Sequence, residues 1–189
     1  MLYISRMYLL LIASVLITVY LTTGIIYFGL RKTNYSAIRH TISELGESGA
    51  RDEKLVGYGL FLPVGFFLLL FAFAATGTIL KGLSACLAAG YIIAALFPCD
   101  AGSPAGGSTK QYIHNLGGFI EYAGSAFFLI RASENDMQLF FINIKIFAFI
   151  VIAGMITISF SSSVRGLVQR IVEILLFGSL TGITWCCSK

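Results

Sequence analysis

The chain has 189 residues, a mean hydropathy of +0.87 and only 12% charged residues, with its apolar residues in long unbroken blocks. A soluble domain carries about a quarter charged residues, so these numbers exclude an ordinary water-soluble fold and indicate a chain solvated by lipid. The net charge of +4 is small and the 13 Lys and Arg residues are scattered, which argues against nucleic-acid binding.

The first predicted element is an apolar segment from Met7 to Leu30, preceded by Arg6. A cleavable signal peptide has a shorter apolar core and a small-residue cleavage site, so we expect a retained transmembrane helix. About 20 apolar residues cross a bilayer. By this measure the predicted spans are residues 7–30, 55–76, 83–98, 113–130, 140–160 and 166–186. The expected fold is all-α: a polytopic six-transmembrane-helix bundle that forms one membrane domain over residues 1–189.

Six crossings would place both chain ends on one side of the membrane. The loops at residues 31–54, 99–112 and 162–165 would then share the other side. Both histidines of the chain, His40 and His114, would therefore lie at the same membrane face.

The long polar loop after the first span contains the stretch RHTISELG. Ser36 is a suitable N-cap and Gly46 a suitable C-cap, so the loop is expected to form a short helix at the membrane interface. On such a helix His40, Ser43 and Glu44 stand at positions i, i+3 and i+4 and share one face.

Further polar residues flank the third and fourth spans. Pro98 ends the third helix within the stretch FPCD, and Asp100 follows at the water boundary. His114 and Glu121 are seven residues apart, so they share a face of the fourth span about 10 Å apart along its axis. An acid at that membrane depth is functional by default, although a structural pairing of Glu121 is an equal alternative.

The last predicted span begins with RGLVQRIVE, residues 165–173. Its Glu173 is expected to be structural, satisfied by Arg170 or Lys110. The residues that converge on the loop side are then His40, Ser43, Glu44, Asp100, His114, Gln169 and Arg170.

Four cysteines are present, but their positions do not suggest a disulfide framework. Cys86 lies in an apolar block, and the adjacent Cys186 and Cys187 would close only a strained ring. No CxxC motif occurs, which argues against a zinc ribbon or a thioredoxin-like site.

The stretches YSAIRHTISELG, FPCD followed by Gly and Pro, HNLGG and GLVQRI occur in an order that resembles the membrane family catalogued as domain of unknown function 998. The resemblance covers essentially the whole chain and implies six spans but no activity. The family often has a second Cys after FPCD, where this chain has Ser103, so no disulfide is expected in that loop. The boundary Ser, Asp and His residues are more loosely similar to those of the ceramidase and progestin-receptor superfamily of membrane zinc hydrolases. That superfamily has seven spans and an HxxxH motif, which is absent here.

This looser similarity leads to the first functional hypothesis, a metal-dependent membrane hydrolase that acts on a lipid. Zinc requires about three protein ligands and a water. The residues expected to serve are His40, Asp100 and His114 as ligands, Glu44 as general base or fourth ligand, Ser43 as nucleophile and Arg170 for an anionic headgroup. The alternative is that the same side chains hydrogen-bond to one another and simply close the end of the bundle.

Two other hypotheses remain open. The two histidines, His40 and His114, would hold a haem in an electron carrier. Alternatively, Glu121, Glu173 and Arg170 would line a polar path in a non-enzymatic lipid-binding or transport protein. In each case the expected partners are membrane lipids and not nucleic acid. The expected location is the plasma (cell) membrane as a multi-pass protein, and the sequence leaves the oligomeric state open.

Overall fold

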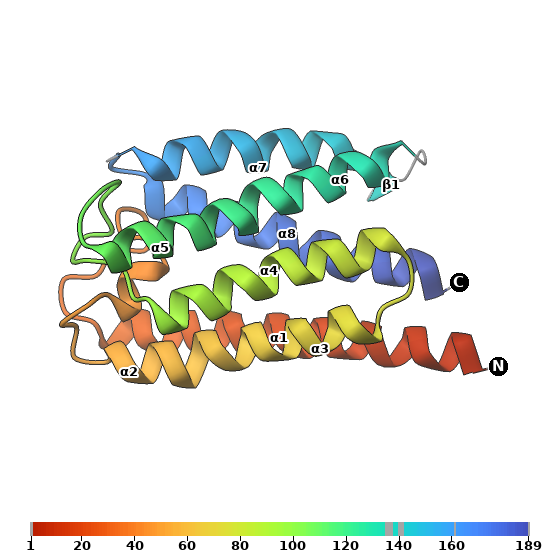
Figure 1. The fold of residues 1–189 in the computed structure, drawn as a ribbon, viewed down its shortest axis with the longest axis horizontal. Helices are drawn as coiled ribbons and strands as arrows, with labels where there is room; N and C mark the ends of the chain where they lie inside the picture. The colour runs from red at the N-terminus through yellow and green to blue at the C-terminus, as the bar shows by residue number, and fades with distance from the viewer. Residues whose placement is uncertain (1, 135–137, 140–141, 161, 189) are drawn as a thin grey trace.

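The computed structural model describes residues 2–134, 138–139, 142–160 and 162–188 and shows long helices lying side by side (Figure 1). Two of the helical rods contain a π-helical turn. In chain order the elements are α1 (Leu2–Arg31), the 3₁₀ turn η1 (Ser43–Gly46), α2 (Glu53–Val56), the π turn η2 (Gly57–Phe61), α3 (Leu62–Ala74), α4 (Thr78–Leu96), α5 (Thr109–Phe119), the π turn η3 (Ile120–Gly124), α6 (Ser125–Ser133), the antiparallel pair β1 (Gln138–Leu139) and β2 (Ile142–Asn143), α7 (Ile144–Ser159) and α8 (Arg165–Ser188). The predicted all-α class is confirmed, apart from this one pair of two-residue strands.

Four helical segments of the described chain are long and apolar enough to cross a membrane. They are Arg6–Arg31, Glu53–Ala74, Thr78–Leu96 and Arg165–Ser188. Large apolar side chains such as Leu16, Phe73 and Ile174 are exposed on the outside of the bundle. Water-facing helices carry polar residues at such positions, so this surface indicates a membrane protein.

The two remaining predicted spans correspond to less typical helices. The rod from Thr109 to Ser133 contains Lys110, Glu121 and Arg131, which lower its mean hydropathy. Helix α7 has only 16 residues, about 24 Å at 1.5 Å per residue, which is shorter than a bilayer core of about 30 Å. The first two residues of the predicted span 140–160 lie outside the described residues.

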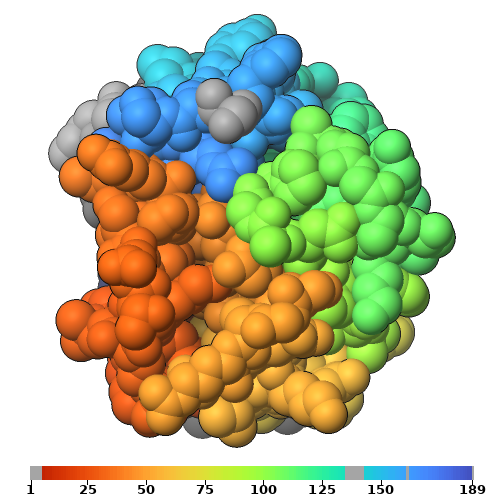
Figure 2. Space-filling model, turned by 90° about the vertical axis from the view of Figure 1, so that its left-hand side faces the viewer, coloured from red at the N-terminus to blue at the C-terminus, as the bar shows by residue number. Residues whose placement is uncertain are grey.

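The chain ends and the main loops lie at opposite ends of the bundle (Figure 1). Both termini are at one end. The loop after α1, the loop between α4 and α5 and the connection between α7 and α8 meet at the other end, which we call the loop end. Figure 2 views this end directly and shows the three segments packed against one another. Both histidines lie here, His40 in the first loop and His114 in the second turn of α5.

Close helix contacts depend on glycines in the interior. A Cβ atom at Gly65 of α3 would lie 2.9 Å from the backbone nitrogen of Ile92 in α4. At Gly154 of α7 a Cβ would lie 2.3 Å from Cγ2 of Val172 in α8. Small residues let membrane helices pack backbone to backbone, because apolar burial alone does not drive their association in lipid.

The predicted interfacial helix over residues 36–46 is wrong, because the structure has a turn at 36–40 followed by the short η1. The carbonyl oxygens that would accept hydrogen bonds within such a helix accept them from residues of α8 instead. Leu167 N donates to Ile38 O, and Arg170 donates to both Ala37 O and His40 O. The first loop is therefore bound to α8 instead of forming its own helix.

Candidate functional site

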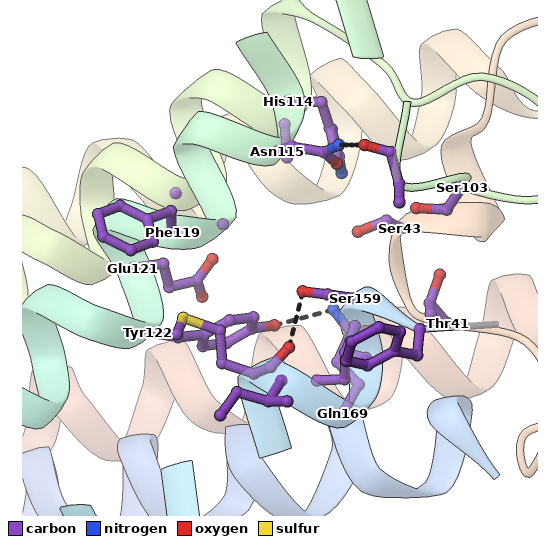
Figure 3. A pocket seen from close by; sticks show the side chains of 18 of the residues that line it. Thr41, Ser43, Ser103, His114, Asn115, Phe119, Glu121, Tyr122, Ser159 and Gln169 are labelled. Carbon is purple, nitrogen blue, oxygen red and sulfur yellow. Dashed lines mark hydrogen bonds between the residues drawn. The ribbon is translucent and has the colours of Figure 1, made fainter. Parts of the chain in front are cut away.

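A cavity of about 500 Å³ opens near the loop end (Figure 3). Its walls come from α4, α5, η3, α7 and the start of α8, together with residues of both loops. Polar and apolar side chains share the lining. The polar ones are Thr41, Ser43, Ser103, His114, Asn115, Glu121, Tyr122, Ser159 and Gln169.

The π turn η3 carries two consecutive buried residues of the site. Both Glu121 and Tyr122 are buried there. Single π turns inside helices are frequent at functional sites.

Glu121 is the unusual member of this lining. Its side chain is only 7% exposed and points into the cavity (Figure 3), yet its Oε1 atom has no hydrogen-bond partner among the described residues. The carboxyl packs against Gly90 of α4, where a Cβ would come within 2.2 Å of Oε2. A buried polar atom without a partner costs about 1–3 kcal/mol, and more when the group is charged. Such an atom points to a proton, water or ligand at this place.

Glu173 of α8 lies within hydrogen-bond reach of Glu121 and has two further partners. The hydroxyls of Tyr91 and Tyr122 each donate to one of its carboxylate oxygens at 2.9 Å. The expectation that Arg170 or Lys110 would satisfy Glu173 is therefore wrong.

The same network continues to the loop end through Gln169. Its Nε2 donates to the Tyr122 hydroxyl at 2.9 Å, and its Oε1 accepts from Ile42 N at 2.6 Å. The buried carboxyl of Glu173 is thereby connected through two side chains to the first loop.

His114 caps the end of α4. Its Nδ1 lies 3.0 Å from the carbonyl oxygen of Phe97, the residue before the helix-breaking Pro98. Because a carbonyl only accepts, Nδ1 carries the proton and Nε2 is the nitrogen left to bind something else. The imidazole is 8% exposed and lines the cavity.

Asp100 organises the second loop. Its carboxylate accepts from the backbone nitrogen and the hydroxyl of Ser108, both at 2.7 Å, and the Ser108 hydroxyl in turn caps α5. These two hydrogen bonds, the backbone one first, lower the pKa of Asp100 below its ordinary value. Asp100 does not line the cavity.

Glu44 is buried and forms an ion pair with Arg165, with Oε1 2.8 Å from Nη2. The same oxygen accepts from Thr41 N, and Thr41 Oγ1 accepts from Glu44 N. This reciprocal pair is a capping box at the start of η1. Arg165 also donates to the carbonyl oxygens of Gly102 and Ser103 in the second loop. Glu44 and Arg165 thus join both loops to α8.

His40 and Arg170 act together outside the cavity. His40 stacks on Tyr35, and its Nδ1 accepts from Ser36 N at 2.8 Å. Arg170 donates to the Tyr35 hydroxyl at 2.6 Å as well as to the loop carbonyls. It also lines a second cavity of about 200 Å³ between α1 and α8.

Of the predicted catalytic residues, only Ser43 lines the main cavity, and it is half-buried there. The Ser43 carbonyl lies 3.5 Å from the sulfur of Cys99. Burial raises the pKa of the Cys99 thiol to about 12, so this sulfur stays protonated. All four cysteines are free, as the absence of a disulfide framework in the sequence predicts.

The structure does not bring the three predicted zinc ligands into one cluster. Within the part of the chain that is described, no group of three or more His, Cys, Asp or Glu side chains is arranged to hold a metal ion. His114 lines the cavity, whereas His40 and Asp100 lie outside it. The arrangement needed for a haem held by both histidines is likewise not formed around this cavity.

Several residues of the site were not predicted from the sequence, among them Tyr91, Tyr122 and Arg165. Tyr91 and Tyr122 sit in apolar stretches, where tyrosines usually fill the core or the interface. Arg165 begins the stretch RGLVQRIVE, and no role was predicted for it. The spacing of Thr41 and Glu44, T-x-x-E, was a readable signal for the capping box.

The profile of the family described as "Protein of unknown function (DUF998)" matches residues 10–185. No curated protein and no solved structure matches the chain.

Proposed function

We propose that this chain, which belongs to the DUF998 family of proteins of unknown function, binds a lipid-like amphiphile. The proposed binding site is the cavity at the loop end. The headgroup would donate hydrogen bonds to the polar lining while the alkyl chain extends into the bilayer. The observation that carries this proposal is the buried, unpartnered Oε1 of Glu121 facing the cavity.

The proposed membrane arrangement has six crossings in the plasma membrane. The rod from Thr109 to Ser133 has 25 residues, about 37 Å, which is enough to cross a bilayer core of about 30 Å. Its charged ends, Lys110 and Arg131, would lie near the two membrane surfaces. The shorter α7 packs along this rod and would cross where the protein borders a thinned bilayer.

Access from the membrane is supported by the apolar part of the cavity lining. Phe119 of α5 and Ile156 and Phe160 near the end of α7 line the cavity and are more than half exposed. In Figure 1 α7 and the α5–α6 rod diverge towards the loop end. An alkyl chain leaving the cavity between these residues would remain in contact with hydrocarbon.

The headgroup chemistry follows from the charges of the lining. Among the described residues that line the cavity there is no Lys or Arg, while Glu121 contributes a carboxyl. Hydrogen-bond acceptors include the Glu121 carboxyl, the hydroxyls of Ser43 and Ser159, and the Asn115 carbonyl. A headgroup that donates, such as an amine or a polyol, fits this set better than an anionic one.

This proposal is preferred over a zinc hydrolase and over a haem carrier on the geometry of the histidines. Zinc needs about three ligands around one point. Asp100 is bonded to Ser108, and His40 is bonded to Ser36 and stacked on Tyr35. Of the three predicted ligands, His114 alone lines the cavity.

Binding of dodecylamine to the purified protein in lipid nanodiscs tests the proposal. We expect saturable binding, and we expect Glu121→Gln to weaken it about 10- to 100-fold. A hydrogen bond to a charged group contributes about 1.5–3 kcal/mol, and 1.4 kcal/mol is a tenfold change in affinity. Glu134→Gln is the matched control, because Glu134 is exposed at the end of α6 and forms an ion pair with Arg131. Equal affinity of the wild type and Glu121→Gln, or no binding above that of empty nanodiscs, would contradict the proposal.

A further inference from the structure

We infer that Glu121 carries a proton while the cavity is empty and exchanges it for the cationic headgroup of the ligand. This inference rests on the proposed amphiphile-binding function and narrows the ligand to an amine. It follows from the unequal surroundings of the two neighbouring carboxyls, Glu121 and Glu173.

The hydrogen bonds of Glu173 favour the negatively charged form of its side chain. Two tyrosine hydroxyls, those of Tyr91 and Tyr122, donate to its two oxygens at 2.9 Å. Hydrogen bonds donated to a carboxylate favour its charged form. Glu121, by contrast, lies within hydrogen-bond reach of Glu173. Its buried Oε1 receives no donor from any other described residue. Two adjacent like charges in a medium of low dielectric repel strongly, so one of the two carboxyls takes up a proton. Glu173 already accepts from two tyrosines, and a protonated Glu121 can donate to it. Glu121 is therefore the carboxyl expected to be neutral.

Among the described residues, no cation is placed to neutralise Glu121 instead. The titratable groups that face it are Cys86 and Tyr91 from α4, Tyr122 beside it in η3 and Glu173 from α8. His114 lines the same cavity two turns earlier on α5. Helix α7 contributes only uncharged residues to the lining, and no Lys or Arg of the described chain lines it.

The exchange conserves charge. An alkylammonium ion enters the cavity, the Glu121 carboxylic acid gives its proton to water, and the carboxylate and the ammonium form an ion pair. The net charge of the buried site is unchanged, because one cation replaces another. A neutral alcohol of the same chain length can accept a hydrogen bond from the acid but cannot displace its proton.

The test measures proton release on ligand binding in weakly buffered nanodisc samples with a pH-sensitive dye. Dodecylamine is the probe, since an alkylamine is an ammonium ion near neutral pH. Dodecanol and empty nanodiscs are the controls. We expect about one proton released per dodecylamine bound, none for dodecanol, and an affinity for dodecylamine that rises up to tenfold per pH unit while Glu121 is protonated. Glu121→Gln should abolish the release.

Infrared spectroscopy of the wild type provides an independent measurement. The carbonyl band of a buried protonated carboxylic acid should be present in the empty protein, be lost on addition of dodecylamine and be absent from Glu121→Gln. Saturable dodecylamine binding without proton release, or with release that persists in Glu121→Gln, would overturn the inference and leave the binding function standing. Absence of the carbonyl band from the empty protein would overturn it too. Absence of saturable dodecylamine binding would overturn the proposed function itself.

Discussion

Replacing Arg165 with Met is expected to lower the free energy of unfolding by about 3–5 kcal/mol, the cost of leaving a buried charge without its partner. The Arg165 and Glu44 side chains are only 12% and 5% exposed. The substitution also removes donors from the carbonyl oxygens of Gly102 and Ser103. Lys32 cannot replace Arg165, because its ammonium group is already paired with Glu47. Titration of the protein in mixed micelles with sodium dodecyl sulfate measures the change.

The control for this prediction is Arg131→Met. Arg131 and Glu134 form an ion pair of similar length, but their side chains are 57% and 51% exposed. Exposed ion pairs contribute at most about 1 kcal/mol, so little change is expected. The double variant Arg165→Met with Glu44→Gln should recover part of the loss, since it removes the unpaired charge. Equal effects of Arg165→Met and Arg131→Met would show that the Glu44–Arg165 pair does not hold the loop end together.

Replacing Gly166 with Ala is expected to destabilise the protein by about 3 kcal/mol, the upper part of the range for overpacking. A Cβ at this position would lie 2.2 Å from His40 O and 2.8 Å from Ala37 O. Both neighbours are backbone atoms, so the first loop has to move away from α8. That movement breaks the hydrogen bond from Leu167 N to Ile38 O and the contacts of Arg170 with the loop.

Gly178 in the same helix is the matched control. It is exposed, and a Cβ there meets nothing within 4 Å. Gly178→Ala is therefore expected to be neutral or to stabilise α8 by up to about 1 kcal/mol. The same denaturation assay compares the two variants. If Gly166→Ala and Gly178→Ala are equally stable, the close approach of the first loop to α8 is not required for folding.

The sequence was informative about the helices because their signal is long and repeated. Inside a bilayer, an apolar run such as residues 7–30 can satisfy its backbone hydrogen bonds by forming a helix. The positions of Pro98 and of the polar loops then followed from the helix ends. His40, in the loop after α1, and His114, near the start of α5, lie at one end of the bundle. This is the arrangement that the two predicted crossings between them require. The number of crossings does not decide whether two residues at the same end are in contact. His114 lines the cavity and His40 does not.

The prediction of a helix in the first loop was wrong for an identifiable reason. Its local pattern, with Ser36 and Gly46 as caps, favours a helix. The donors Leu167 and Arg170, more than 120 residues later in the chain, take its carbonyl oxygens. Local propensity is a weak prior when distant groups satisfy the backbone, and one sequence does not reveal such a pairing.

The buried acids show a similar limit. The position of Glu121 within the predicted fourth span was readable, but the lack of a donor to its Oε1 was not. That property depends on the π turn at Ile120–Gly124, on Gly90 and on the two tyrosines that serve Glu173. None of these relations has a fixed spacing in the sequence.

The most direct measurement of the central claim is photocrosslinking with a long-chain alkylamine that carries a diazirine on its chain. Labelled peptides from wild-type protein in nanodiscs are identified by mass spectrometry, with and without excess dodecylamine. The predicted result is saturable labelling of residues 109–124 and 144–160, around Glu121 and α7, which dodecylamine prevents and Glu121→Gln reduces. Labelling spread equally over the lipid-facing sides of α1 and α3, without competition, would contradict a binding cavity at the loop end.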